Sequence, residues 1–147
     1  MLLKNQVAII TGATRGIGRA IALRFAEEGC NIAFCGRTRN ENMIAVENEI
    51  AALGVNAKGY AVDVTQFQAS QDFVKQVVDD FGHIDILVNN AGITSDNSLK
   101  RMTEEQWDSV INANLKSVFC MTKAVHPYLG KQGSGSIFLV ADALSPR

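Results

Sequence analysis

Short apolar runs recur along the chain, separated by longer stretches in which apolar residues return every three or four positions. Short runs bounded by polar and glycine residues predict buried β-strands, and the three-to-four-residue spacing predicts amphipathic helices. The predicted strands cover residues 7–10, 32–35, 59–62, 84–88 and 137–141. Their apolar character on both faces is typical of a parallel sheet with helices on both sides.

Two helices are marked by apolar residues on one face, namely Met43, Val46, Ile50 and Leu53 in the first and Val74, Val77, Val78 and Phe81 in the second. Candidate capping boxes predict helix starts at Thr38 with Glu41, Thr65 with Gln68, and Thr103 with Gln106. Glycines predict the helix ends at Gly29, Gly54, Gly82 and Gly130. Four strand-helix repeats ending on a fifth strand predict an α/β, Rossmann-like doubly wound parallel sheet.

Length and composition fit one packed domain over residues 1–147. The chain is 47% apolar, and its 14 basic and 15 acidic residues leave a net charge of -1, so no charge surplus indicates nucleic acid or an anionic membrane as a partner. The three cysteines form no CxxC pair, which argues against a zinc site or a disulfide framework. No run of 18 apolar residues occurs, and we expect a cytoplasmic protein.

A glycine-rich loop follows the first predicted strand. It reads Thr11-Gly12-Ala13-Thr14-Arg15-Gly16-Ile17-Gly18 and opens a predicted helix with Ile17, Ala20, Ile21 and Phe25 facing inward. Glycines let a pyrophosphate approach the backbone, where free N–H groups and the helix dipole favour its negative charge. The loop therefore predicts a dinucleotide site, and a tight strand-helix turn without a ligand is the alternative.

The segment after the second predicted strand favours NADP(H) over NAD(H). NAD-binding loops usually present an acidic side chain to the ribose 2′-hydroxyl there, yet residues 29–40 contain no Asp or Glu. Instead Arg37, Thr38 and Arg39 follow the strand, and Arg15 lies in the glycine loop. Guanidinium groups suit a phosphate monoester, although arginines in loops are also common as solvated surface charges.

The order of three motifs resembles the short-chain dehydrogenase/reductase family, particularly its 3-oxoacyl-acyl-carrier-protein reductases. The motifs are the glycine loop, Asp63 with Val64, and Asn89-Asn90-Ala91-Gly92; residues 93–97 are a weaker match to the acyl-carrier reductases. The resemblance implies that these residues contact the cofactor, with Asp63 at the adenine. Structural roles stay open for Asp63, as the start of a turn before Thr65, and for Asn89 and Asn90, as partners of backbone groups at a strand end.

The resemblance also implies the catalytic positions. Asn114 lies at helical spacing with the apolar residues Trp107, Ile111, Val118 and Val125, so we expect its amide on the apolar face of a helix over residues 103–129. The family role of Asn114 is to hold a proton-relay water, and a satisfied core asparagine is the alternative. Asp142 stands at the family's catalytic Ser position, and the chain ends at Arg147 before the family's Tyr-x-x-x-Lys motif.

These features lead to one expected function and two alternatives. The resemblance implies NADPH-dependent reduction of a 3-oxoacyl thioester on an acyl-carrier protein, by full-length relatives that are homotetramers. We expect the chain itself to be an incomplete domain without activity. Its resemblance to the family weakens after Ile137, which a shifted reading frame or an early stop would explain. The alternatives are a non-catalytic NADP-binding module and a reductase of another carbonyl substrate.

Overall fold

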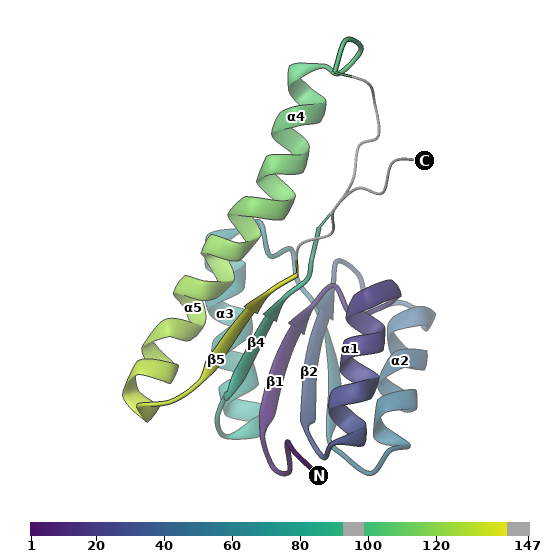
Figure 1. Ribbon diagram of the computed structural model, residues 1–147, viewed down its shortest axis with the longest axis vertical. Coiled ribbons are helices and arrows are strands. Elements are labelled where there is room, and N and C mark those ends of the chain that lie inside the picture. The colour runs from purple at the N-terminus through teal and green to yellow at the C-terminus, as the bar shows by residue number, and fades with distance from the viewer. Residues whose placement is uncertain (93–98, 141–147) are drawn as a thin grey trace.

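A single five-stranded parallel sheet organises the protein (Figure 1). The computed structural model describes residues 1–92 and 99–140. The strands are β1 (Val7–Thr11), β2 (Asn31–Gly36), β3 (Ala57–Ala61), β4 (Ile86–Asn89) and β5 (Ser136–Leu139), in the order β3-β2-β1-β4-β5. All neighbouring pairs are parallel, which confirms the predicted sheet and all five strands.

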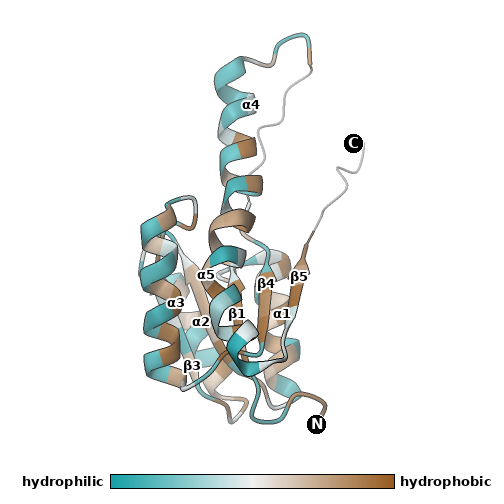
Figure 2. Cartoon of the chain, turned by 90° about the vertical axis from the view of Figure 1, so that its left-hand side faces the viewer, coloured by the Kyte–Doolittle hydropathy of each residue, from teal (hydrophilic) through white to brown (hydrophobic). Residues whose placement is uncertain are grey.

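Helices cover the two faces of the sheet, as the doubly wound prediction requires. The helical segments are α1 (Gly16–Glu27), α2 (Glu41–Ala51), α3 (Phe67–Phe81), α4 (Glu104–Ile111), the π-helical η1 (Asn112–Lys116) and α5 (Ser117–Gln132). The helices α1 and α2 lie on one face, α3 and α5 on the other, and α4 extends beyond the carboxyl ends of the strands (Figures 1 and 2). None of the described helices is long and apolar enough to cross a membrane.

Two apolar clusters fill the spaces between sheet and helices, and β1 contributes to both. Val7 and Ile9 belong to the cluster under α3 and α5, whereas Ala8 and Ile10 belong to the cluster under α1 and α2. Successive side chains of a strand point to opposite faces, so a strand buried on both sides must be apolar throughout. This explains why β1 shows a continuous apolar run instead of an alternating pattern.

The predicted helix boundaries are only partly correct. Thr103 and Gln106 form the predicted capping box at α4. At α2 the N-cap is Asn40, whose side chain accepts from the Met43 N–H, so the prediction of Thr38 is wrong. Thr65 is not an N-cap either, because the N-cap of α3 is Gln66, and the Thr65 hydroxyl donates to Asp63 at 2.6 Å. Several short polar residues precede each helix, and the strand-to-helix turn decides which of them reaches the free N–H groups.

The predicted glycine stops at Gly29, Gly54 and Gly82 are correct, because each follows its helix with a positive φ, and the stop at Gly130 is wrong. Gly82 follows α3 as its C-cap with φ +92°, a conformation that glycine adopts without strain. Gly130 lies inside α5, which continues to Gln132 and ends at the left-handed Gly133 instead. A glycine inside a helix is tolerated at a cost of about 1 kcal/mol relative to alanine. Two nearby glycines therefore leave the helix end ambiguous in sequence.

The inward face of α1 differs from the prediction. Small residues make this face, and they are Gly18, Ala22 and Ala26. Ile17 and Ala20 are exposed, while Ile21 and Phe25 are partly buried. A methyl group added at Gly18 would come within 2.4 Å of the Gly12 carbonyl oxygen, so the helix begins almost in contact with the preceding loop. This close approach selects small residues for the buried face.

Candidate functional site

The predicted cofactor residues gather where the strand order reverses. From β1 the chain proceeds outward to β2 and β3, then returns to place β4 on the other side of β1. The carboxyl ends of parallel strands at such a reversal leave a crevice between diverging loops, which is where ligands of doubly wound sheets bind. The glycine loop after β1 and the 89–92 segment at the end of β4 lie on the two sides of this point.

Hydrogen bonds join these two loops. The buried Thr11 hydroxyl oxygen accepts from the backbone N–H groups of Asn90 at 3.0 Å and Ala91 at 2.9 Å. The Asn90 side-chain amide donates to the Gly12 carbonyl at 3.0 Å. The structural role left open for Asn90 is therefore present. Thr11 and Asn90 therefore hold the two loops together and fix the shape of the crevice.

Each of the three glycines of the loop is required for a different structural reason. A Cβ at Gly12 would lie 2.9 Å from the Ala91 Cα, and a Cβ at Gly18 would lie 2.4 Å from the Asn90 amide nitrogen, so both positions are closed by neighbouring atoms. Gly16 has φ +59° and no atom within 4 Å of its Cβ position. Backbone at Gly16 therefore borders open space at the N-terminus of α1, which is the geometry that admits a pyrophosphate.

Side chains from β2 and its loop lie next to the glycine turn. The Gly12 N–H donates to the Cys35 carbonyl at 3.0 Å, and the Thr14 methyl group would be 3.0 Å from a Cβ at Gly36. Asn42 also donates its side-chain amide to the Thr14 carbonyl at 2.9 Å. These contacts place the loop that begins at Arg37 beside the glycine loop.

The three arginines near this loop are not equivalent. Arg39 binds Glu47 through both terminal nitrogens, at 3.1 and 3.2 Å, and also donates to the Gly59 carbonyl at 3.1 Å. Arg15 and Arg37 are exposed and form no ion pair with any described residue. Arg39 is thus occupied in the fold, whereas Arg15 and Arg37 present charge to solvent beside the crevice. Thr38 is exposed as well.

Asp63 follows β3 and forms a turn with Thr65. One carboxylate oxygen accepts from the Thr65 N–H at 3.0 Å and from the Thr65 hydroxyl at 2.6 Å. These hydrogen bonds, with smaller contributions from the positive charges of Arg37 and Lys116, lower the pKa of Asp63. The turn role left open for Asp63 is therefore present, and its carboxylate is held in the charged form. Val64 beside it is buried in the core under α3 and α5.

Asn89 is buried at the end of β4. Its side-chain amide lies 3.4 Å from the Thr122 hydroxyl on α5, and its carbonyl accepts from the Val140 N–H at 3.0 Å. Asn89 therefore links β4 to α5 and to the end of β5. This is the structural role that the sequence left open for it.

Asn114 does not lie on a buried apolar face as predicted. It is exposed, within η1, and its Oδ1 would be 2.9 Å from a Cβ at Gly92. The prediction assumed one regular helix over residues 103–129, but the π-helical turn changes the angular spacing between α4 and α5. We found no signal for this turn in the sequence. It brings the Asn114 amide to the 89–92 segment instead of to the core.

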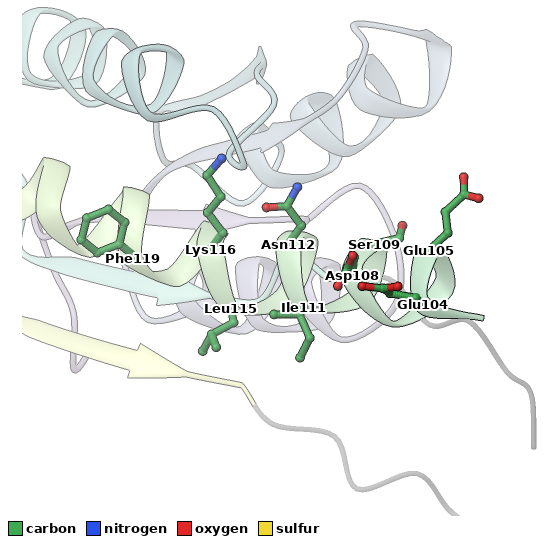
Figure 3. Close-up of a pocket in the computed structure, with 9 residues that line it drawn as sticks. All are labelled: Glu104, Glu105, Asp108, Ser109, Ile111, Asn112, Leu115, Lys116 and Phe119. Atoms are coloured by element: carbon green, nitrogen blue, oxygen red, sulfur yellow. The ribbon is translucent and has the colours of Figure 1, made fainter. Parts of the chain in front are cut away.

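A groove of about 1010 Å³ lies elsewhere, along α4, η1 and the start of α5 (Figure 3). Its lining includes the acidic Glu104, Glu105 and Asp108 together with the exposed apolar Leu115 and Phe119. None of the predicted cofactor residues lines this groove. Asp142 and the 93–97 stretch lie outside the described residues.

Comparison with known proteins identifies the family. The model of the short chain dehydrogenase family matches residues 6–144, beyond the position at which we expected the resemblance to weaken. The 3-oxoacyl-[acyl-carrier-protein] reductase FabG of Staphylococcus epidermidis is 47% identical over 133 residues, 90% of this chain and 54% of that protein. The corresponding Thermotoga maritima protein is 44% identical over 144 residues, 98% of this chain and 58% of that protein.

Solved structures agree with the fold. The NAD+-bound xylitol dehydrogenase is 35% identical with a TM-score of 0.92, covering 97% of this chain and 55% of its own. A metagenomic short-chain oxidoreductase in complex with NADP is 34% identical with a TM-score of 0.89, covering 100% of this chain and 67% of its own. The chain spans about half the length of the curated relatives it matches. On the family match and the geometry together, the chain belongs to the short chain dehydrogenase family.

Proposed function

We propose that this chain binds NADP(H) in the crevice between β1 and β4, as the cofactor-binding part of a 3-oxoacyl-[acyl-carrier-protein] reductase. The observation that carries the proposal is the joined pair of loops, with Thr11 and Asn90 fixing the turn and Gly16 bordering open space. The NADP complex of a relative and the FabG names of the most similar curated proteins support it.

Each predicted residue has a part in this arrangement. Residues 12–18 hold the pyrophosphate through backbone N–H groups at the start of α1. The ribose 2′-phosphate lies beside Arg15, Arg37 and Thr38. The two guanidinium groups have no ion-pair partner among the described residues, and they favour the doubly charged 2′-phosphate, which NADH lacks. Asp63 and Val64 border the adenine, and residues 89–92 border the nicotinamide half. Arg39 is excluded from our proposed phosphate site since Glu47 already neutralises it.

When bound, NADPH would supply a hydride for the substrate carbonyl carbon. The oxygen then needs a proton, which we assign by resemblance to a relay held by Asn114 and its neighbours. We propose that the 147-residue chain alone binds the cofactor without measurable turnover. Neither of its tyrosines, Tyr60 or Tyr128, has a lysine four residues later, and Asp142 lacks a hydroxyl at the family's serine position. A carboxylate there repels the developing oxyanion.

The test of the binding site is a titration of NADPH and NADH into the folded chain, followed by cofactor fluorescence. We expect tighter binding of NADPH. Gly16→Val places an isopropyl group in the open space and should abolish binding. The matched control is Gly54→Val, because Gly54 has φ +90° and the same empty surroundings but lies after α2, at the opposite end of the sheet. Equal affinity for both cofactors, or NADPH binding retained by Gly16→Val, contradicts the site.

The test of turnover is the loss of NADPH absorbance with an acetoacetyl thioester. Proton donation by a positioned side chain contributes about 100- to 10,000-fold to rates, so its loss hides activity. We expect no turnover by this chain or by Asp142→Ser, and turnover by a chain extended through a Tyr-x-x-x-Lys segment. Equal rates for the 147-residue and extended chains contradict the proposal. Xylitol oxidation with NAD+ is the comparison assay for a different substrate class.

A further inference from the structure

Asn42, on the first turn of α2, connects two parts of the crevice that are distant in sequence. Its side-chain amide donates to the Thr14 carbonyl of the glycine loop at 2.9 Å. The residue is exposed, whereas the buried face of α2 is made by Met43, Val46 and Ile50. Core packing therefore does not explain the side chain of Asn42. The bond to Thr14 is its only side-chain hydrogen bond with a described residue.

This hydrogen bond orients the peptide unit between Thr14 and Arg15. The C=O and N–H groups of a planar trans peptide point in opposite directions, so a Thr14 carbonyl directed at α2 turns the Arg15 N–H away from α2. Arg15 is the N-cap residue of α1, and its own side chain forms no capping hydrogen bond. Asn42 therefore fixes the backbone from which the Arg15 guanidinium group extends.

The start of α2 also holds the loop that carries Arg37. At the end of this loop Asn40 caps α2, with its side chain accepting from the Met43 N–H at 3.0 Å. At its beginning, a Cβ at Gly36 would lie 3.0 Å from the Thr14 methyl group and 3.3 Å from the Met43 methyl group. The residues that precede Arg15 and Arg37 are thus neighbours, and one helical turn supports both loops.

A second contact between α1 and α2 limits what the loss of this hydrogen bond can change. The two helices lie side by side on one face of the sheet, and Arg19 on α1 forms an ion pair with Glu49 on α2 (Figure 1). Replacing Asn42 should therefore leave the helices in place and loosen the start of α1, where Arg15 is attached.

We propose that Asn42 is a positioning residue for cofactor specificity, which holds the Thr14–Arg15 peptide unit so that the guanidinium groups of Arg15 and Arg37 bind the same 2′-phosphate. This inference rests on the proposed NADP(H) site and adds to it a residue that acts without contacting the phosphate. Ordering a long side chain on binding costs free energy, and a fixed backbone lowers that cost. Loss of the Asn42 amide should therefore weaken NADPH binding more than NADH binding.

The first experiment compares NADPH and NADH, which differ only in the 2′-phosphate, by fluorescence titration of the full chain. Asn42→Leu keeps the approximate size of the side chain and removes the donor. We expect the ratio of NADPH to NADH affinity to fall about three- to tenfold, which corresponds to one hydrogen bond. The matched control is Asn48→Leu, which should keep the ratio, because Asn48 is exposed on the same helix and forms no side-chain hydrogen bond with a described residue. Circular dichroism checks that both variants fold.

A double-mutant cycle tests whether Asn42 acts through Arg15. Arg15→Ala alone should lower the affinity ratio, and adding Asn42→Leu to it should lower the ratio little further, because the guanidinium group that Asn42 positions is already absent. Adding Asn42→Leu to Arg37→Ala should still lower the ratio, since Arg15 is present in that background.

The outcomes separate this inference from the proposed function on which it rests. Equal affinity of the unaltered chain for both cofactors overturns the proposed NADP(H) site and the role of Asn42 with it. A clear NADPH preference that Asn42→Leu leaves unchanged, or that Asn48→Leu lowers equally, overturns the role of Asn42 alone. The same follows if Asn42→Leu lowers the ratio as much in the Arg15→Ala background as in the unaltered chain.

Discussion

The strands β1 and β5 have similar apolar sequences and opposite surroundings. All five residues of β1 are buried between helices on both faces, whereas all four residues of β5 are exposed. Both were predicted as strands from the same kind of apolar run, and both are strands. An apolar run therefore predicts the strand, but the elements packed on either side determine whether the strand is core or surface.

The helices repeat this contrast. The helices α1, α2 and α3 each bury residues against the sheet, while α4 buries none and extends away from it (Figure 2). The residues that we propose for the cofactor site lie mostly on the strands and loops of the packed region, and Asn114 lies at its boundary in η1. Four predictions test the contrast between well-packed and exposed parts of the protein, beginning with the largest expected effect.

Truncating an isoleucine in each strand should show the contrast most directly. Ile9→Ala removes fully buried methyl groups and should lower the free energy of unfolding by about 2–5 kcal/mol. Ile137→Ala, at a half-exposed position, should cost less than about 1 kcal/mol. Urea denaturation followed by circular dichroism measures both. Similar losses would mean that β5 is as well packed as β1.

Replacing Arg37 and Arg39 one at a time should distinguish a charge that binds the cofactor from a charge that stabilises the fold. Arg37→Asp should weaken NADPH binding by about 1–3 kcal/mol and NADH binding much less, because it removes a charge-assisted contact to the 2′-phosphate. Arg39→Ala should leave the ratio of NADPH to NADH affinity unchanged, since Arg39 binds Glu47 and the Gly59 carbonyl. Cofactor titrations decide this, and an unchanged ratio in Arg37→Asp would assign the preference elsewhere.

Removing the capping box should destabilise α4 alone. Thr103→Ala leaves the Gln106 N–H in the first turn of α4 without its hydrogen-bond partner, a loss of about 0.5–2 kcal/mol. Because α4 buries no residue, we expect faster amide hydrogen exchange in α4 with unchanged protection in the sheet. Thr38→Ala is the control, since Thr38 caps no helix. Reduced protection throughout the sheet would show that α4 is coupled to the core.

The smallest effect is expected at β3, the outermost strand beside β2, as a dependence of stability on pH. Lys58 and Tyr60 donate to Asp80 at 2.8 and 2.6 Å, and these hydrogen bonds lower the pKa of Asp80 to about 2. A lowered folded-state pKa stabilises the protein above the unfolded pKa of about 4, and that contribution disappears as the pH falls from about 4 to 2. Asp80→Asn should flatten the pH dependence in this range, measured by thermal melts.

Local sequence determined the strands, the glycine loop and one of three predicted caps. These features depend on neighbouring residues alone: an apolar run flanked by turn residues, a glycine where φ is positive, and a hydroxyl three residues before Gln106. The three ordered motifs also carried the family resemblance that the family model then matched over residues 6–144.

Only the tertiary structure decided the caps at α2 and α3, the small buried face of α1 and the exposure of Asn114. Each depends on groups distant in sequence or on a change of helical spacing: Asn90 closes the space at Gly18, and the π-helical turn rotates Asn114 toward Gly92. The contacts of the Gly59 backbone on β3 with Glu47 and Arg39 were decided in the same way. A strand's own residues specify its conformation, but its hydrogen-bond partners and covering layers come from elsewhere in the chain.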